Sequence, residues 1–113
     1  MTKDNQILLS LIENLMKTNK PIWKKVAAEL SRPRRQRVEV NLSKIESYAV
    51  DDTTLLVPGK VLGAGVVSKK VNVAAFSFSD KAKALISAAG GKAMTIESLH
   101  KTNPEGRGIM ILK

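Results

Sequence analysis

The side chains of this chain are best equipped to bind a polyanion. Eight lysines and arginines lie within the twenty-one residues 17–37, where a single acid, Glu29, opposes them. This segment holds +7 of the formal net charge of +9 of the 113-residue chain. Guanidinium groups bind phosphate oxygens bidentately and each neutralised phosphate releases counterions, so the segment predicts binding to RNA or DNA. The eight cations are Lys17, Lys20, Lys24, Lys25, Arg32, Arg34, Arg35 and Arg37.

The alternative for such a cluster is a solvated surface without a partner. A solubilising surface usually alternates the two signs of charge, whereas here one acid meets eight bases, and a polyanion is the simplest source of compensation. An anionic membrane is disfavoured because the basic arm, residues 32–37, lacks bulky apolar anchors. Only four aromatic residues occur, which argues against stacking of successive unpaired bases. We expect recognition through phosphate contacts and shape.

Three cations outside this segment are further candidates for phosphate contacts. Two interpretations of Lys69 and Lys70 stand equal: an ordinary solvated turn, or the tip of a hairpin from which both lysines would reach a phosphate. Arg107 lies between two glycines in the turn sequence 103–108. That composition predicts an exposed arginine whose flanking backbone is open on both sides.

The residues that could support catalysis do not form a recognisable site. The glycine-rich stretch 58–65 fits neither a P-loop nor a dinucleotide-binding fingerprint, so we expect a connector whose backbone approaches a partner. Glu46, Asp51 and Asp52 are the nearest approach to clustered carboxylates. His100 is the only histidine and is expected to be solvated near a helix end. Cysteine is absent, which excludes thiolate catalysis and Cys-ligated metals. We predict no enzyme activity, cofactor or metal.

Two helices are expected to carry the cationic segment. Apolar residues at helical spacing predict an amphipathic helix over 4–17. After a short break, Pro21 suits the first turn of a second helix, and the two should pack on each other. The second helix should end at Ser31 or Arg32, since Pro33 disfavours a helical conformation in the residue before it. The basic arm then follows as a loop or extended segment. We expect it to be poorly ordered without RNA, because neither apolar anchors nor opposite charges fix it.

The rest of the chain, residues 38–113, reads as an α/β body. Short β-rich runs are followed by a polar cap and a few helical residues, a pattern that favours an α/β layer with a largely parallel sheet. The chain is thus expected to form a single domain over 1–113, with a helical pair at 1–31, the basic arm, and this body. The strands are expected at 38–40, 54–57, 71–76, 92–94 and 108–112.

Local signals predict where the helices of this body begin and end. Ser43 and Glu46 have the spacing of a capping box. Ser79 is a candidate cap for a helix that Gly90 and its neighbouring glycine would close in a left-handed conformation. Thr95 precedes a third, shorter helix.

Several of these stretches together resemble one ribosomal protein family. They are VPGKVLG at 57–63, VNVAAFSFS at 71–79, TIESL at 95–99 and NPEGRG at 103–108, together with the Arg-Pro-Arg-Arg run. The combination is similar to the archaeal and eukaryotic large-subunit ribosomal protein eighteen of the e-type, a relative of bacterial large-subunit protein fifteen. The similarity covers essentially the whole chain. Eukaryotic members are longer at both ends, so this compact chain resembles the archaeal ones.

The resemblance implies both a fold and a role. The implied fold is an irregular superhelix of strand–helix units, and the implied role is a non-catalytic constituent of the large ribosomal subunit, docked on ribosomal RNA. Expected partners are large-subunit ribosomal RNA and neighbouring ribosomal proteins, with no membrane and no small-molecule substrate. We expect a cytoplasmic protein that is a monomer outside the ribosome. A free-standing RNA chaperone or regulator, and an enzyme that uses the glycine-rich stretch, are the alternatives.

Overall fold

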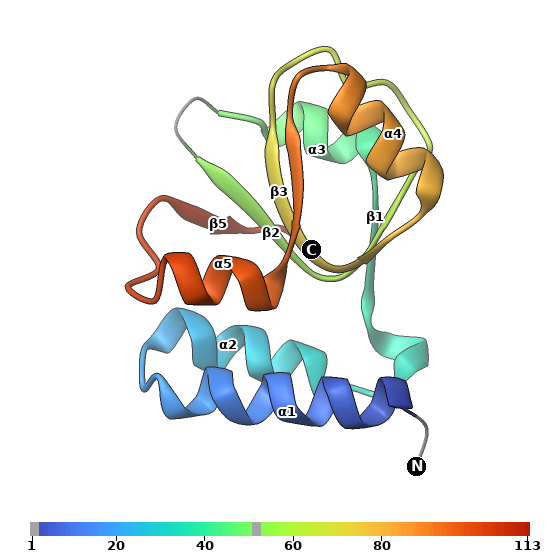
Figure 1. Cartoon of the computed structure of the whole chain (residues 1–113). Helices are drawn as coiled ribbons and strands as arrows, with labels where there is room; N and C mark the ends of the chain where they lie inside the picture. Colours follow the sequence, from blue (N-terminus) through green and yellow to red (C-terminus); the bar gives the residue numbers. More distant parts are fainter. Residues whose placement is uncertain (1–2, 51–52) are drawn as a thin grey trace.

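A computed structural model describes residues 3–50 and 53–113, with the side chains of residues 3–5 and 34 left undescribed. An initial helical pair is followed by strands and helices that alternate except between β2 and β3, which no helix separates (Figure 1). In chain order the elements are α1 Lys3–Lys17, α2 Pro21–Leu30, a 3-10 turn η1 at Arg34–Gln36, β1 Val38–Asn41, α3 Leu42–Tyr48, β2 Thr54–Leu62, β3 Asn72–Phe78, α4 Asp80–Ala88, β4 Lys92–Thr95, α5 Ile96–Thr102 and β5 Ile109–Ile111.

The helices α1 and α2 form an antiparallel pair along one side of the molecule (Figure 1). The tight turn between them passes through Asn19, which adopts a left-handed conformation with φ of 57°. Leu15 of α1 and Trp23 of α2 are completely buried between the pair and the sheet. Pro21 occupies the first turn of α2 and Ser31 is its C-cap, so the predicted helical pair and its boundaries are confirmed.

All strand pairs in the sheet are parallel, which confirms the predicted α/β class. The hydrogen-bonded order is β1-β2-β3-β4, and β5 pairs with β2 on the edge that β1 also uses. Both fit on one edge because β5 pairs with the first part of β2, from Thr54, and β1 pairs with its last part, from Gly59. The central strand β2 is therefore longer than predicted and includes most of the glycine-rich stretch.

The glycine-rich stretch was expected to be a connector, and this expectation is wrong for its first half. Residues 58–62 continue β2, with an irregularity in its register against β3 between Val57 and Lys60. A Cβ atom at Gly59 would lie 1.9 Å from the main-chain oxygen of Val38. The glycine thus permits the close approach of β1 within the sheet, rather than the approach of an external partner.

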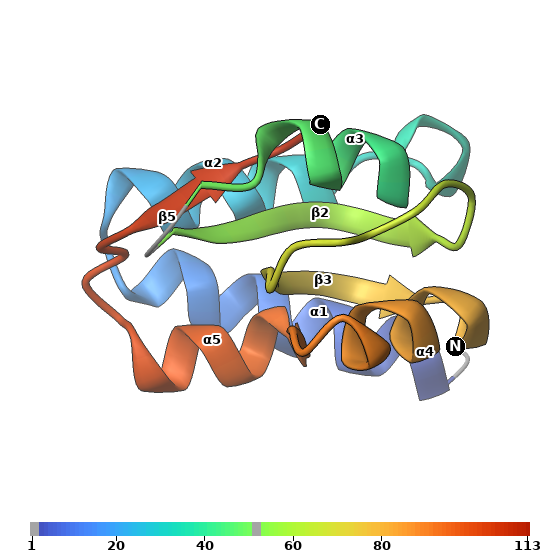
Figure 2. The ribbon, with the colours of Figure 1, turned by 90° about the horizontal axis from the view of Figure 1, so that it is seen from above.

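Helices cover both faces of the sheet and define two cores. One face packs against α1, α2 and α5, and the other against α3 and α4 (Figures 1 and 2). Successive side chains of β2 point to opposite faces of the sheet. Leu56 belongs to the core beneath α1, α2 and α5, while Leu55 and Val57 belong to the core beneath α3 and α4. No helix in the described ranges has the length and hydropathy that crossing a bilayer requires.

Two of the three predicted helix caps are confirmed. The hydroxyl of Ser79 accepts a hydrogen bond from the Ala82 amide at 3.1 Å, and Gly90 has the left-handed φ of 84° after α4. Thr95 caps α5 in the same way. The capping box in α3 is wrong, because α3 already begins at Leu42 and the Glu46 carboxylate instead accepts hydrogen bonds from Ser68.

Candidate nucleic-acid interface

The helix α2 presents one buried and one cationic face. Trp23, Val26 and Leu30 are fully buried against the sheet side, as their spacing requires. Lys24 and Lys25 lie on the exposed face. A ten-residue helix is about 15 Å long, so the residues at the two ends of α2 are separated by about that distance. Both ends carry further cations.

At the N-terminal end of α2, the turn between α5 and β5 brings a distant segment to the helix. The indole Nε1 of Trp23 donates a hydrogen bond to the main-chain oxygen of Pro104 at 2.9 Å. Lys20 forms an ion pair with Glu105, with 3.3 Å between Nζ and Oε2. A Cβ atom at Gly106 would lie 2.6 Å from the Ile22 side chain, so the turn packs closely on α2.

The same turn fixes the backbone of Arg107. The amide nitrogen Nδ2 of Asn103 donates to the main-chain oxygen of Arg107 at 2.7 Å, and the Arg107 amide donates to Asn103 Oδ1 at 3.3 Å. The flanking residues Gly106 and Gly108 have positive φ values of 76° and 67°, which only glycine adopts readily. Arg107 is exposed, as predicted, and lies next to α2, which the sequence did not indicate.

At the C-terminal end of α2, the basic arm forms a compact turn rather than an extended segment. Its central residues form η1, and the Gln36 amide donates to the main-chain oxygen of Pro33 at 2.8 Å. Arg37 Nε donates to the main-chain oxygen of Arg32 at 3.1 Å and so closes the turn. The main-chain oxygens of Arg32 and Pro33 are thereby hydrogen-bonded within the arm. Of the two predicted forms, a loop or an extended segment, the arm thus adopts the loop.

The single acid of the cationic segment is buried at this end of α2. Glu29 is 7% exposed, and its carboxylate accepts a hydrogen bond from Lys113 Nζ at 2.7 Å. The Arg32 Nε lies 3.4 Å from the other carboxylate oxygen. The pKa of Glu29 is lowered, chiefly by the Lys113 hydrogen bond and further by the charges of Arg32, Lys113 and Lys25, while burial opposes the change. The premise that no opposite charge fixes the arm is therefore wrong for Arg32.

We call the exposed cations of α2, of the segments at its two ends and of the adjoining 103–108 turn the α2 surface. Among the described side chains, acids lie within ion-pair distance of only two of its members, Lys20 and Arg32. The side chain of Arg34 is outside the described part of the chain. The described members of the α2 surface are Lys17, Lys20, Lys24, Lys25, Arg32, Arg35, Arg37 and Arg107.

Lys69 and Lys70 do not lie on the α2 surface. Of the two alternatives for this lysine pair, the hairpin is wrong, because β2 and β3 pair in parallel and residues 63–71 form the crossover between them. Val67 and Val71 of this crossover belong to the core of α3 and α4, on the other face of the sheet. Lys69 Nζ donates to the main-chain oxygen of Glu46 in α3 at 3.4 Å.

His100 is half-buried, which corrects the expectation of a solvated side chain. Its ring meets Trp23 edge-on, with the ring centroids 4.9 Å apart, and its Nε2 forms a hydrogen bond with the Thr18 hydroxyl. Burial lowers the pKa of His100. The histidine therefore helps to join α5 to the helical pair. Of the three candidate carboxylates, Glu46 binds Ser68, while Asp51 and Asp52 lie outside the described residues.

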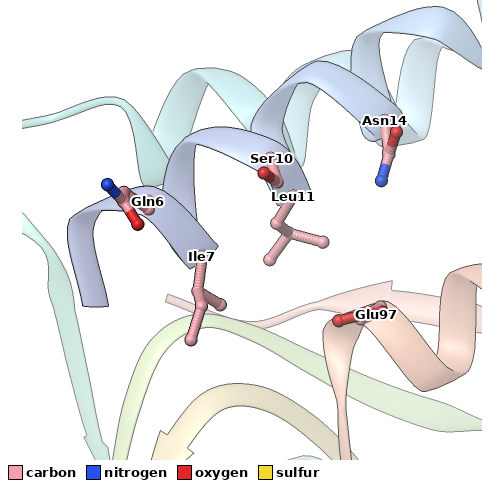
Figure 3. A pocket seen from close by; sticks show the side chains of 6 residues that line it. All are labelled: Gln6, Ile7, Ser10, Leu11, Asn14 and Glu97. Atoms are coloured by element: carbon pink, nitrogen blue, oxygen red, sulfur yellow. The ribbon is translucent and has the colours of Figure 1, made fainter. Parts of the chain in front are cut away.

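A groove lies between α1 and α5 (Figure 3). No described cation of the α2 surface lines it. Among the described side chains that line it, Glu97 alone is ionisable, and it pairs with Lys101 at 3.1 Å. Such a lining lacks the converging groups that acid–base or nucleophilic catalysis requires. The groove is lined by Gln6, Ile7, Ser10, Leu11, Asn14 and Glu97.

Comparison with known proteins identifies the family. The family model described as ribosomal protein 60S L18 and 50S L18e matches residues 2–113. The chain belongs to this family. It is 50% identical over 110 residues to the large ribosomal subunit protein eL18 of Methanococcus maripaludis, which covers 97% of this chain and 92% of the relative. It is 49% identical over 116 residues to eL18 of Archaeoglobus fulgidus, covering 99% of each chain. The resemblance to the archaeal form of the family is confirmed.

Two residues of the α2 surface region were missed from the sequence, for different reasons. Glu29 precedes Arg32 by three residues, a spacing that brings side chains together at the end of a helix and could have indicated the pair. Lys113 is 84 residues from Glu29 in the chain. No local pattern indicates that contact, because it depends on β5 lying beside β2.

Proposed function

We propose that this chain is a structural component of the large ribosomal subunit that binds ribosomal RNA through the α2 surface. The observation that carries the proposal is that the 103–108 turn packs on the helix that carries most of these cations, because this places Arg107, 70 positions beyond Arg37, next to α2. Most of these side chains face solvent without a described acid partner, and such cations are those that exchange counterions for phosphates. Membership of the ribosomal family supports RNA as the polyanion.

The α2 surface favours recognition of the RNA backbone and its shape over recognition of unpaired bases. Trp23 is completely buried, and Phe76 and Phe78 are partly buried. Tyr48, which is 49% exposed, belongs to α3 on the other face of the sheet. No exposed ring among the described side chains is therefore available beside α2 for stacking on bases. The cations position the protein on phosphates, and the layered body serves as a rigid mount.

The proposal includes three further cations, each on different grounds from the α2 surface. Arg34 lies within the basic arm and is included as a phosphate contact on its sequence position alone. Lys69 and Lys70 would need a second RNA segment, since they lie on the other side of the sheet. We propose that the protein works in the cytoplasm, beside neighbouring ribosomal proteins, and is a monomer before assembly. Neither a cofactor nor a catalytic step is part of this function.

A direct test measures the affinity of the purified chain for two long RNAs at equal salt. The probes are transcripts of the large- and small-subunit ribosomal RNAs of Methanococcus maripaludis, whose eL18 is half identical to this chain. We expect preference for the large-subunit transcript, with crosslinks from α2, the basic arm and the 103–108 turn. Equal affinity for both transcripts, or crosslinks only from the α3 and α4 side, would reject the proposal.

The runner-up, a free-standing RNA chaperone or regulator, predicts a different distribution in cells. A ribosomal constituent should sediment with large subunits and remain bound when the salt concentration is raised, because many contacts are made at once. A chaperone should leave the particle under those conditions. Sedimentation of the tagged chain in an archaeal host separates the two functions.

A further inference from the structure

We propose that Glu29 is a positioning residue for RNA binding, whose buried carboxylate holds Arg32 so that the terminal Nη1 and Nη2 groups of the guanidinium are left for a phosphate. This inference rests on the proposed function of the α2 surface and deepens it. It assigns a role to Glu29, the one acid among the charged residues of segment 17–37, all the others of which are cations.

The geometry at Glu29 distinguishes the parts of the Arg32 guanidinium. The nitrogen closest to the carboxylate is Nε, at 3.4 Å from Oε2, while the Arg32 side chain as a whole is 52% exposed. Nη1 and Nη2 make no hydrogen bond to the described residues. These two groups form the fork that binds two phosphate oxygens in parallel. A carboxylate at Nε therefore restrains the side chain without occupying its phosphate-binding edge.

Glu29 is itself fixed, so it can serve as a rigid support. Its other oxygen accepts the hydrogen bond from Lys113 Nζ, and the main-chain oxygen of Lys113 accepts one from Lys44 Nζ at 2.5 Å. Leu112, the residue before Lys113, is buried and its amide donates to Leu56 of β2 at 2.8 Å. The carboxylate is thus tied through Lys113 to the centre of the sheet. A side chain held in this way does not need to be ordered when RNA binds.

The same arrangement recurs at Arg37, which strengthens the inference. Arg37 Nε donates to the main-chain oxygen of Arg32, so this guanidinium is also held by the nitrogen that is not part of the terminal fork. The side chain of Arg35, which lies between them in the sequence, makes no hydrogen bond or ion pair with a described residue, so it serves as an unrestrained arginine for comparison. Of the three arm arginines whose side chains the structure describes, two are therefore held in a fixed orientation and one is not.

Charge alone and positioning make opposite predictions for Glu29→Gln. The substitution raises the net charge by one and releases Lys113 from its ion pair, so electrostatics alone predicts tighter binding to RNA. If Glu29 positions Arg32, the variant must order that side chain on binding and should bind about threefold to tenfold more weakly. The sign of the change decides between the two accounts.

The experiment measures affinity for the Methanococcus maripaludis large-subunit ribosomal RNA transcript at fixed salt. Glu39→Gln is the matched control, because Glu39 is exposed on β1 next to the arm and has no described partner. It should bind as tightly as the wild type or slightly more tightly. Glu29→Asp keeps the charge but withdraws the carboxylate by one methylene, and should also bind more weakly. In an Arg32→Ala background, Glu29→Gln should no longer weaken binding, since the residue it positions is absent.

The outcomes separate this inference from the proposed function. If the wild type shows no preference for the large-subunit transcript, the proposed function fails. If the wild type binds but folded Glu29→Gln binds as tightly as Glu39→Gln, only the positioning role fails. Should Glu29→Gln not fold, NMR of the wild type decides. The Nε–H protons of Arg32 and Arg37 should exchange with water more slowly than that of Arg35, and equal rates would overturn the inference.

Discussion

Neutralising Lys24 and Lys25 tests whether α2 is the element that meets the RNA. Both side chains are exposed on the outer face of α2, and neither lies within ion-pair distance of a described acid. Glutamine has nearly the helix propensity of lysine, so the double variant Lys24→Gln, Lys25→Gln removes two charges with little effect on folding. Any change in RNA binding then reports on the lost phosphate contacts.

The size of the effect follows from the number of phosphates. Six described cations of the α2 surface lack an acid partner, and contact with about four to six phosphates gives a slope of log affinity against log salt of about −3 to −5. Each lost contact reduces the slope by about 0.7 to 0.9. For a wild-type slope of about −4, raising monovalent salt from about 0.1 to 0.3 M weakens binding about 80-fold. The double variant, with a slope of about −2.4, should lose only about 14-fold.

The assay is filter binding of the large-subunit transcript over a series of salt concentrations. Lys81→Gln with Lys83→Gln is the control, since it removes the same charge from exposed positions of α4, on the other face of the sheet and outside the proposed contacts. Its slope should stay close to the wild-type value. Equal reductions of the slope in both double variants would show that RNA binding depends on the total charge of the protein and not on where the lysines lie. An unchanged slope in the α2 variant would refute the assignment of α2 as the interface.

Three further predictions concern the supports of this surface and of the sheet. Gly59→Ala should destabilise the fold by about 1–3 kcal/mol or more in urea unfolding, because its Cβ would overlap the main-chain oxygen of Val38. Asn103→Ala removes two hydrogen bonds to the backbone of Arg107 and should cost about 1 kcal/mol of stability together with a few-fold loss of RNA affinity. Burial lowers the pKa of His100, so its contribution to stability is complete above the ordinary value of 6.5 and falls as the pH drops below it. Unfolding at pH 7.5 and 5.5 should show this loss in the wild type and not in His100→Gln.

Local signals in the sequence predicted the helical pair, the strand–helix order and the parallel sheet. Pro21, Ser79 and Thr95 act through their immediate neighbours, so their effects can be recognised without knowledge of the fold. The length of β2 could not be predicted in this way. Glycine is typical of connectors. Gly59 lies inside a strand because β1 pairs so closely with β2 that the main-chain oxygen of Val38 leaves no room for a Cβ atom.

The candidate site was predictable in its composition but not in its assembly. The cations of residues 17–37 are evident from charge alone, whereas the position of Arg107 depends on Trp23 binding the main-chain oxygen of Pro104. Lys69 and Lys70 show the same limit of local patterns. A lysine pair predicts an exposed turn, but which side of the sheet it occupies is set by the parallel crossover between β2 and β3.

Assembly from distant segments determines when the α2 surface can form. The 103–108 turn supports one end of α2 and Lys113 supports the other through Glu29, so both ends depend on the last strand of the chain pairing with β2. A chain without β5 in place would still carry the cations of residues 17–37, but Arg107 would not lie beside them. Such a chain would bind RNA through charge alone, with the ordering of each side chain reducing the affinity. If the α2 surface binds RNA as we propose, complete folding of the sheet contributes to its selectivity, because a fixed arrangement of cations matches only some arrangements of phosphates.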